Sequence, residues 1–182
     1  FAILRKFNMK LNPTKCAFGV SSGKFLGHLV SRRGIEANPE KIRAVINMKS
    51  PKTTKEVQSL AGRVAALNRF VSRATDRCLP FFKILRKAFE WSEECEKAFQ
   101  ELKKYLASPP LLSTPIPKEE LFLYLAVSRS AVSSAMVREE HGIQYPVYYT
   151  SRALQGAESR YPRIEKLAFA LITSARRLRP YF

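Results

Sequence analysis

The sequence has little aspartate and no closely paired cysteines. Asp76 is the only aspartate among 182 residues. Because two-metal phosphoryl chemistry normally requires several convergent hard carboxylates, most often Asp, the chain can hardly supply such a site. The three cysteines form no CxxC pair and have only His28 and His141 as possible co-ligands. This favours reduced, mostly buried thiols in an intracellular protein over a disulfide framework or a zinc site.

Long apolar runs are also missing. The clearest one, residues 121–127, has the length of a strand and is too short to cross a membrane. No signal segment is recognisable, and the chain starts at Phe1 in the middle of a pattern, so we expect a fragment of a longer protein. Hydrophobic residues make up 46% of the sequence, which is enough for a packed core and argues against a disordered chain.

Acidic residues are scarce relative to basic ones. Lys and Arg number 32 against 15 Asp and Glu, a formal net charge of +17, which exceeds what solubility requires and indicates a polyanionic partner. Residues 1–88 contain 19 Lys/Arg and 4 Asp/Glu (net +15), whereas residues 89–182 contain 13 and 11 (net +2). The first half is therefore expected to carry the binding surface, and the second half to be an ordinary globular module.

The first 35 residues predict the end of a helix and two hairpins. Apolar groups within residues 1–9 recur as on the last turns of a helix. Apolar runs at 16–20 and 25–30 flank Ser21-Ser22-Gly23, which predicts a hairpin with its turn at these three residues. The turn residues Ser31-Arg32-Arg33-Gly34 predict a second hairpin directly after it.

Residues 36–88 carry the signals of three helices, which together predict a small basic bundle. Asn38-Pro39-Glu40 is a helix start with a capping side chain, a proline suited to the first position and an acidic residue beside the positive end of the dipole. Thr53-x-x-Glu56 matches a capping box and predicts a helix from about residue 54 to residue 70. Pro80 opens the third helix.

The second half predicts a helix, a connector, three strands and a final helix. Ser92 can cap a helix whose apolar stripe runs to Leu106, and the proline-rich segment after it predicts an extended connector. Strands are expected at 121–127, 133–138 and 145–150, the first of them buried on both faces because it is continuously apolar. The final helix is expected to bury one apolar stripe: Ile164, Leu167, Ala168, Leu171, Ile172, Ala175 and Leu178. The expected fold class is α+β.

Four segments, in this order and spacing, resemble gypsy-type LTR-retrotransposon reverse transcriptases. Lys10-Leu11-Asn12-Pro13-Thr14-Lys15-Cys16-Ala17-Phe18 and Phe25-Leu26-Gly27-His28 are similar to the end of the palm. Residues 57–70 and 80–91 are similar to the thumb and to the segment that leaves it. The resemblance implies three parts: a palm end with a primer-grip hairpin at 1–35, a helical thumb at 36–88, and a truncated RNase H-like connection domain at 89–182.

The RNase H-like part lacks the carboxylates that the resemblance implies. In active relatives the first strand ends in Thr-Asp-Ala-Ser, and the metal-binding Asp of that pattern falls on Ala126. The second carboxylate of the pattern Ile-Glu-Lys-Glu-x-Leu-Ala falls on Leu167, although a two-residue gap would bring Glu165 to the position. We therefore expect a degenerate module that binds no catalytic metal pair, as in plant lineages that carry a second, active RNase H downstream.

The resemblance also implies roles for two groups of residues near the polymerase centre. Lys15 falls where the family has a palm lysine near the triphosphate of the incoming nucleotide. Asn12, Cys16 and Phe18 in register favour this role over the alternative of a solvated lysine beside a hairpin. The grip residues Phe25, Leu26, Gly27 and His28 would approach the 3′ end of the primer, while Phe25 and Leu26 could equally pack in the core.

Arginines in the helical part are the remaining candidates for nucleic-acid binding. Arg69, Arg73 and Arg77 recur at i, i+4 on the expected helix, unless a break near Ser72 spoils the alignment. Like charges at this spacing destabilise a helix by about 0.2–0.5 kcal/mol per pair, so the plain alternative is a solvated face partly relieved by Asp76. Given the charge of this half, we assign these arginines and Arg63 to phosphate contacts.

The function expected is that of a fragment of an RNA-directed DNA polymerase that grips and positions the primer-template, with an inactive RNase H-like tether. Its partners would be an RNA–DNA or DNA duplex and the rest of the Pol polyprotein, in a cytoplasmic virus-like particle or the nucleus. The segment itself needs no cofactor, and the Mg²⁺ ions of the parent enzyme belong to palm residues outside it. Two alternatives remain: a stand-alone basic nucleic-acid-binding protein, or an active RNase H that uses Glu165.

Overall fold

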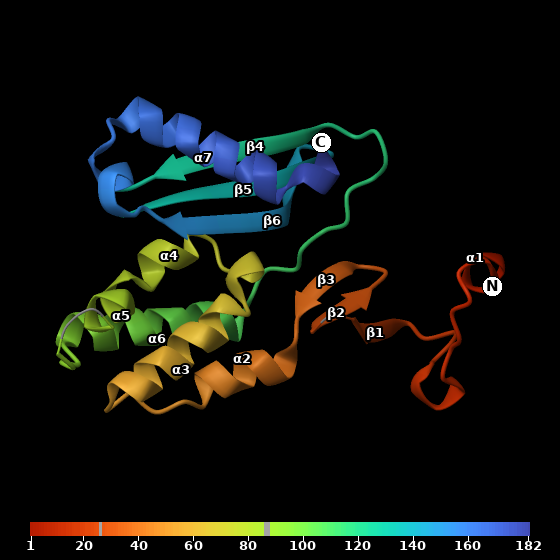
Figure 1. Ribbon diagram of the computed structural model, residues 1–182, viewed down its shortest axis with the longest axis horizontal. Coiled ribbons are helices and arrows are strands. Elements are labelled where there is room, and N and C mark those ends of the chain that lie inside the picture. The colour runs from red at the N-terminus through yellow and green to blue at the C-terminus, as the bar shows by residue number, and fades with distance from the viewer. Residues whose placement is uncertain (26, 86–87) are drawn as a thin grey trace.

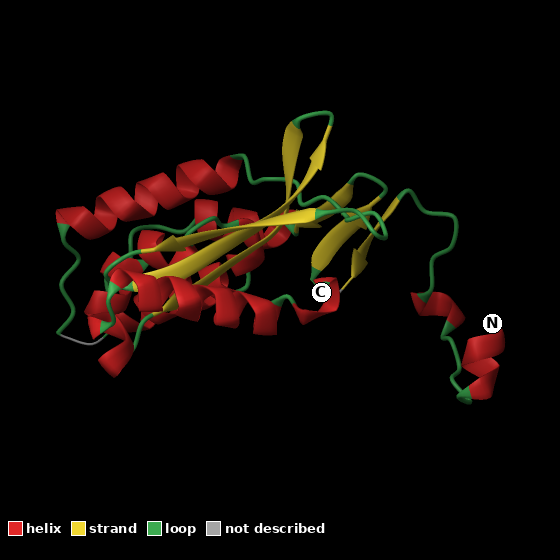
Figure 2. Cartoon of the chain, turned by 90° about the horizontal axis from the view of Figure 1, so that it is seen from above, coloured by secondary structure: helices red, strands yellow, loops and turns green. Residues whose placement is uncertain are grey.

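A computed structural model describes residues 1–25, 27–85 and 88–182. Its architecture is α+β, with two separate three-stranded antiparallel sheets and a group of helices that lies below the second sheet in Figure 1, which confirms the predicted fold class. Helix α1 (Ala2–Lys6) and the 3₁₀ turn η1 (Pro13–Lys15) form an N-terminal arm that stands apart from the rest (Figure 2).

The first sheet is formed by β1 (Ser22–Phe25), β2 (His28–Ser31) and β3 (Gly34–Ala37). The predicted turn at Ser21-Ser22-Gly23 is wrong, because Phe25 pairs with His28 and the chain reverses between them. Gly27 has a φ of 78°, a left-handed value that suits glycine, and it supplies the turn that residues 21–23 were expected to make. The second predicted hairpin is confirmed, since Ser31 pairs with Gly34.

In the described residues the helical body consists of five α-helices and one 3₁₀ turn: α2 (Pro39–Ile46), α3 (Thr54–Ala65), η2 (Asn68–Phe70), α4 (Ala74–Arg77), α5 (Leu79–Ile84) and α6 (Glu93–Ala107). The three predicted caps are confirmed, because the side chains of Asn38, Thr53 and Ser92 each accept a hydrogen bond from a backbone N–H in the first turn. The continuous helix predicted over residues 54–70 is wrong. It ends at Ala65, and Arg73, with a φ of 51°, separates η2 from α4.

The core of the helical body extends from Ala37 to Leu112 and includes α6. Phe70, Phe81 and Phe99 are fully buried in it. Trp91 stacks on Phe81 at a centroid distance of 5.8 Å and meets Phe99 edge to face at 5.9 Å. The stripe predicted for α6 is confirmed at its apolar positions, so this helix packs with the residues that precede it in the sequence.

The second sheet is formed by β4 (Leu121–Val127), β5 (Ala131–Glu140) and β6 (Ile143–Ala153) as a meander, with the predicted turn at His141 and Gly142. Helix α7 (Arg163–Arg177) packs against β4 and β5 (Figure 1). The burial of β4 on both faces was predicted wrongly. Its residues alternate, and Phe122 and Tyr124 are exposed because only the face with Leu121, Leu123, Leu125 and Val127 packs against buried side chains.

The stripe predicted for the last helix is right at its end, where Leu178 is fully buried, but wrong for most of α7. The residues that α7 buries are Lys166, Ala170 and Ser174, whereas Ile164 and Ile172 are 72% and 51% exposed. Small side chains at 170 and 174 allow the helix to approach the sheet closely. The Ser174 hydroxyl is satisfied locally, because it donates to the Ala170 carbonyl at 2.7 Å, whereas the Lys166 ammonium donates to the Arg129 carbonyl at 3.5 Å.

Candidate nucleic-acid interface

The β1–β2 hairpin carries the residues assigned to the primer grip. Phe25 is 65% exposed and does not pack in the core. The His28 ring lies 5.4 Å from the Phe70 ring, and burial, together with the positive charges of Arg69 and Lys41, lowers the pKa of His28. Leu26 lies outside the described residues. The hairpin therefore presents Phe25 to solvent while His28 is anchored to the helical body.

Lys15 lies in the N-terminal arm, at the last position of η1, where it is exposed. The turn is fixed by Asn12, whose side-chain oxygen accepts hydrogen bonds from the Thr14 N–H at 3.1 Å and from its hydroxyl at 2.6 Å. The local geometry holds Lys15 in a defined turn, and its proposed contact with a nucleotide stays a prediction.

The four arginines assigned to phosphate contacts do not lie on one helical face. Arg63 is exposed at the end of α3 and donates to the Ala44 carbonyl, and Arg73 pairs with Asp76 at 3.3 Å. The Arg77 Nε donates to the Ser72 carbonyl at 3.0 Å, and its guanidinium lies 4.6 Å from the centre of the Tyr105 ring. The break at residues 66–73 that precedes α4 disperses them, and Arg77 is engaged in internal contacts.

Arg69 faces the second sheet. Its guanidinium lies 4.4 Å from the centre of the Tyr148 ring on β6, and it donates to the Tyr181 hydroxyl at 3.3 Å. Such cation–π contacts contribute about 0.5–2 kcal/mol, depending on desolvation. Arg69 therefore joins the helical body to the second sheet rather than lining a common surface with Arg73.

Two further hydrogen bonds cross the same junction. The Thr75 N–H donates to the Ser151 hydroxyl at 3.0 Å, and the Ser128 hydroxyl donates to the Asp76 carboxylate at 2.7 Å. Asp76 also accepts from Arg73. The only aspartate of the chain thus links helix α4 to the loop between β4 and β5.

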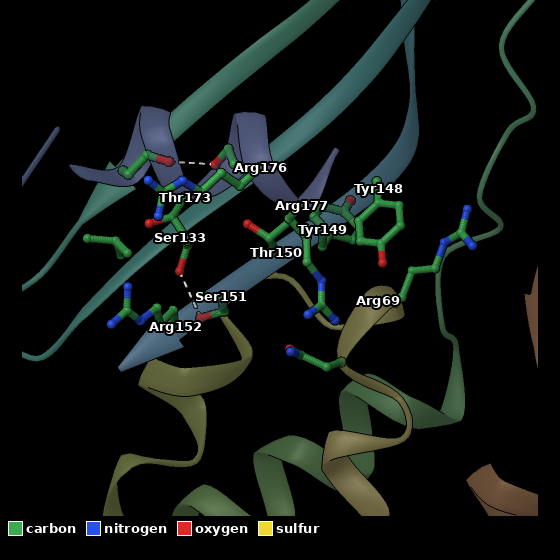
Figure 3. A pocket seen from close by; sticks show the side chains of 14 residues that line it. Arg69, Ser133, Tyr148, Tyr149, Thr150, Ser151, Arg152, Thr173, Arg176 and Arg177 are labelled. Carbon is green, nitrogen blue, oxygen red and sulfur yellow. Dashed lines mark hydrogen bonds between the residues drawn. The ribbon is translucent and has the colours of Figure 1, made fainter. Parts of the chain in front are cut away.

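A cavity of about 350 Å³ opens beside this junction (Figure 3). It lies between η2, the strands β5 and β6, and helix α7, and its charged lining residues are four arginines: Arg69, Arg152, Arg176 and Arg177. Figure 3 shows Arg69 near the Tyr148 end of the β6 segment and Arg152 at the other end. No carboxylate belongs to its lining in the described part of the chain.

Hydroxyl groups fill the floor of this cavity. The side chains of Ser133 and Ser151 lie 3.0 Å apart, and Thr173 adds a hydroxyl from α7. The sequence prediction missed Arg152, Arg176 and Arg177. The pair at the end of the helix resembles an ordinary complement to the helix dipole, so only the fold brings these residues to Arg69.

The two positions expected to have lost catalytic carboxylates offer no oxygen to a metal. Ala126 is exposed on β4 and pairs with Ser133, Leu167 is half-buried on α7, and Glu165 is exposed in the first turn of that helix. Within residues 1–25, 27–85 and 88–182, no three His, Cys, Asp or Glu side chains are grouped so that they could hold a metal ion. These residues do not fit the metal pair of an active RNase H.

None of the helices in the described ranges is both long and apolar enough to cross a membrane.

Three antiparallel strands followed by a covering helix are the opening elements of an RNase H-like fold. Residues 91–182 match the family described as the RNase H-like domain found in reverse transcriptase, and the chain belongs to this family. The match begins at Trp91, so it includes α6, the second sheet and α7.

Similar proteins are the Pol polyproteins of retrotransposons. The chain is 30% identical over 183 residues to the retrovirus-related Pol polyprotein from transposon 412 of Drosophila melanogaster, which covers all of this chain and 15% of that protein. It is 29% identical to the transposon Tf2-3 polyprotein of Schizosaccharomyces pombe, over 98% of this chain and 14% of that protein. The chain thus spans about one seventh of the length of these relatives.

The fold is also similar to a solved foamy viral protease-reverse transcriptase in complex with an RNA/DNA hybrid. The TM-score is 0.74 at 22% sequence identity, and the similarity covers 90% of this chain and 23% of that one. The likeness extends across the helical body as well as the RNase H-like sheet, because it covers far more of the chain than residues 91–182.

Proposed function

We propose that the chain is a segment of the reverse transcriptase of a gypsy-type, plant-like retrotransposon, and that it grips and positions the primer-template duplex. In this assignment residues 1–35 are the end of the palm, residues 36–88 the thumb, and residues 89–182 a connection domain. The relatives with 30% and 29% identity are retrotransposon Pol polyproteins, and the structural neighbour holds an RNA/DNA hybrid, which supports a duplex as the partner. The virus-like particle and the nucleus are the compartments in which such a polyprotein would act.

The observation that carries this proposal is the concentration of exposed positive charge on residues 1–88. In the described part of this range Lys41, Arg69 and Arg77 are half-buried and the other Lys and Arg side chains are exposed. A net charge of +15 on one half of a folded chain creates a surface that attracts a polyanion. A duplex carries one phosphate charge per 1.7 Å of its axis, so it matches an extended basic surface.

We further propose that the segment catalyses neither polymerisation nor hybrid cleavage by itself. The Mg²⁺ ions of the parent enzyme would be held by palm carboxylates outside this segment. The second candidate, an active RNase H, depends on Glu165, which is exposed in the first turn of α7. Metal-dependent cleavage of an RNA–DNA hybrid by the purified chain, abolished in Glu165→Gln, would establish that candidate and contradict ours.

Binding is tested by fluorescence anisotropy with a labelled RNA–DNA hybrid at several salt concentrations. We expect log affinity to fall linearly with log salt, with a slope of about −0.9 for each phosphate contacted. The matched variants are Lys52→Gln/Lys55→Gln on the helical body and Glu139→Gln/Glu140→Gln at the β5–β6 tip. The first pair should weaken binding, and the second should leave it unchanged or strengthen it. Binding that does not respond to salt would contradict the proposal.

A further inference from the structure

The arginine cavity between the helical body and the RNase H-like sheet has an electrostatic imbalance. Of its four arginines only Arg152 has an ion-pair partner in the described part of the chain, Glu158 at 2.8 Å. Arg176 and Arg177 project from the C-terminal turn of α7 and are exposed. Like charges gathered around one cavity repel one another, so an anion between them would lower the electrostatic energy of the folded chain.

The cavity also contains buried polar atoms without partners. The Arg69 Nε and the Asn68 side-chain oxygen are both buried and have no hydrogen-bond partner within the described ranges, and both residues line the cavity. A buried donor left without an acceptor costs about 1–3 kcal/mol. Because these two atoms have almost no accessible surface, a side-chain shift of Arg69 would be needed to bring its donor to an anionic oxygen in the cavity.

We propose that this cavity binds a phosphate group of the nucleic-acid backbone through Arg69, Arg176 and Arg177. The inference rests on the proposed function, since it names where on the chain one strand is held. Guanidinium groups bind phosphate in a bidentate manner, and serine and threonine hydroxyls donate to phosphate oxygens, as the Ser133, Ser151 and Thr173 hydroxyls can here. The bound strand would bridge η2 and α7, which both contribute residues to the lining of the cavity.

A backbone phosphate fits the cavity better than an acidic peptide. A volume of about 350 Å³ exceeds a single phosphate group and accommodates an attached sugar. The lining carries four arginines and the hydroxyls of Ser133, Ser151 and Thr173, which suit the oxygens of a phosphate group. The Tyr148 ring is covered by Arg69, so at this point the site offers charge and hydrogen bonds rather than a free surface for stacking a base.

The first test compares Arg176→Gln/Arg177→Gln with Arg160→Gln/Arg163→Gln in the full chain. Both doubles remove two exposed positive charges from the RNase H-like module, but only the first pair lines the cavity. We expect the cavity double to bind a labelled RNA–DNA hybrid about tenfold more weakly than the control double. Its salt slope should be shallower by about 0.9, the contribution of one phosphate.

The second test introduces a carboxylate with Thr173→Glu. If the cavity binds phosphate, this variant should raise the melting temperature, because the carboxylate sits among unpaired arginines, and should weaken hybrid binding at the same time. A lower melting temperature combined with weaker binding would report a folding defect, which would overturn the inferred charge imbalance. Inorganic phosphate should raise the melting temperature of the unmodified chain but not of the Arg176→Gln/Arg177→Gln double.

The outcomes separate this inference from the proposed function. If the unmodified chain fails to bind the hybrid, both fail. If it binds and the two doubles are equal, only the cavity assignment fails. Protection by inorganic phosphate without any difference in hybrid affinity would identify the ligand as free phosphate and overturn the backbone assignment, as would competition by poly-glutamate equal to that by the hybrid.

Discussion

Gly34 is the position at which substitution by alanine should most disrupt the contact between strand β3 and the connector after α6. It has a φ of 135°, and a Cβ built on it would lie 2.1 Å from the backbone oxygen of Leu112. Next to it, Ile35 and Leu112 exchange two backbone hydrogen bonds of 2.8 and 3.0 Å, and Leu112 is fully buried in the core of the helical body.

The cost of Gly34→Ala can be summed from these contacts. A non-glycine residue held at such a φ costs about 1–3 kcal/mol. The carbonyl of Leu112 must also move to accommodate the methyl group, which weakens two hydrogen bonds worth about 0.5–1.5 kcal/mol each. If both hydrogen bonds are lost, we expect the free energy of unfolding to fall by about 2–6 kcal/mol. For a chain of this size that corresponds to a melting temperature lower by roughly 4–24 °C.

Gly23→Ala is the matched control in the same sheet. Gly23 lies on β1, has no atom within 4 Å of an added Cβ and has no left-handed φ, so its substitution should change stability by less than about 0.5 kcal/mol. Urea denaturation followed by the fluorescence of the single tryptophan, which packs in the helical core, measures both variants. Equal midpoints for the two variants would refute the close approach of β3 to the connector.

Three further results are expected. Phe99→Ala should lower the free energy of unfolding by about 3–5 kcal/mol because Phe99 is fully buried, whereas Phe18→Ala, at a side chain 74% exposed, should stay within about 0.5 kcal/mol in the same urea titration. Burial raises the pKa of Cys78 to about 12, so a colorimetric thiol-modification assay of the native chain at pH 8 should modify Cys16 and leave Cys78 unmodified. Rapid modification of the Cys78 thiol would contradict its burial. Burial and two nearby cations lower the pKa of His28 in the folded chain, so protonation favours the unfolded state and stability should decline as the pH falls below 6.5; an NMR titration midpoint at or above 6.5 would disprove this.

The sequence correctly predicted the features of the fold that depend on neighbouring residues alone. Caps at Asn38, Thr53 and Ser92 and the turn at His141-Gly142 were predicted correctly, because each depends on a side chain or glycine acting on its own backbone. The apolar stripe of α6 was also correct, since one face of that helix meets a continuous core.

Predictions failed where burial depends on what lies opposite. An apolar periodicity says which residues share a face, but α7 turns its small residues Ala170 and Ser174 to the sheet and leaves Ile164 exposed. In the same way β4 is continuously apolar, yet buried side chains cover only one of its faces. The arginine cavity was missed for a related reason, because Arg69 and Arg177 are 108 positions apart and meet only through the packing of η2 beside β6.

At helix α6 the boundary of the family match and the boundary of the hydrophobic core of the helical body do not coincide. The family match begins at Trp91, but Phe99, Leu102 and Leu106 of α6 pack into a core built by residues 37–84. In a protein cut at residue 91, the apolar face of α6 would be exposed to solvent. The other fragment would expose the core residues that α6 normally covers. Recombination between elements at that point would exchange half of a hydrophobic core, whereas a junction after Leu112, the last residue of that core, would leave it whole.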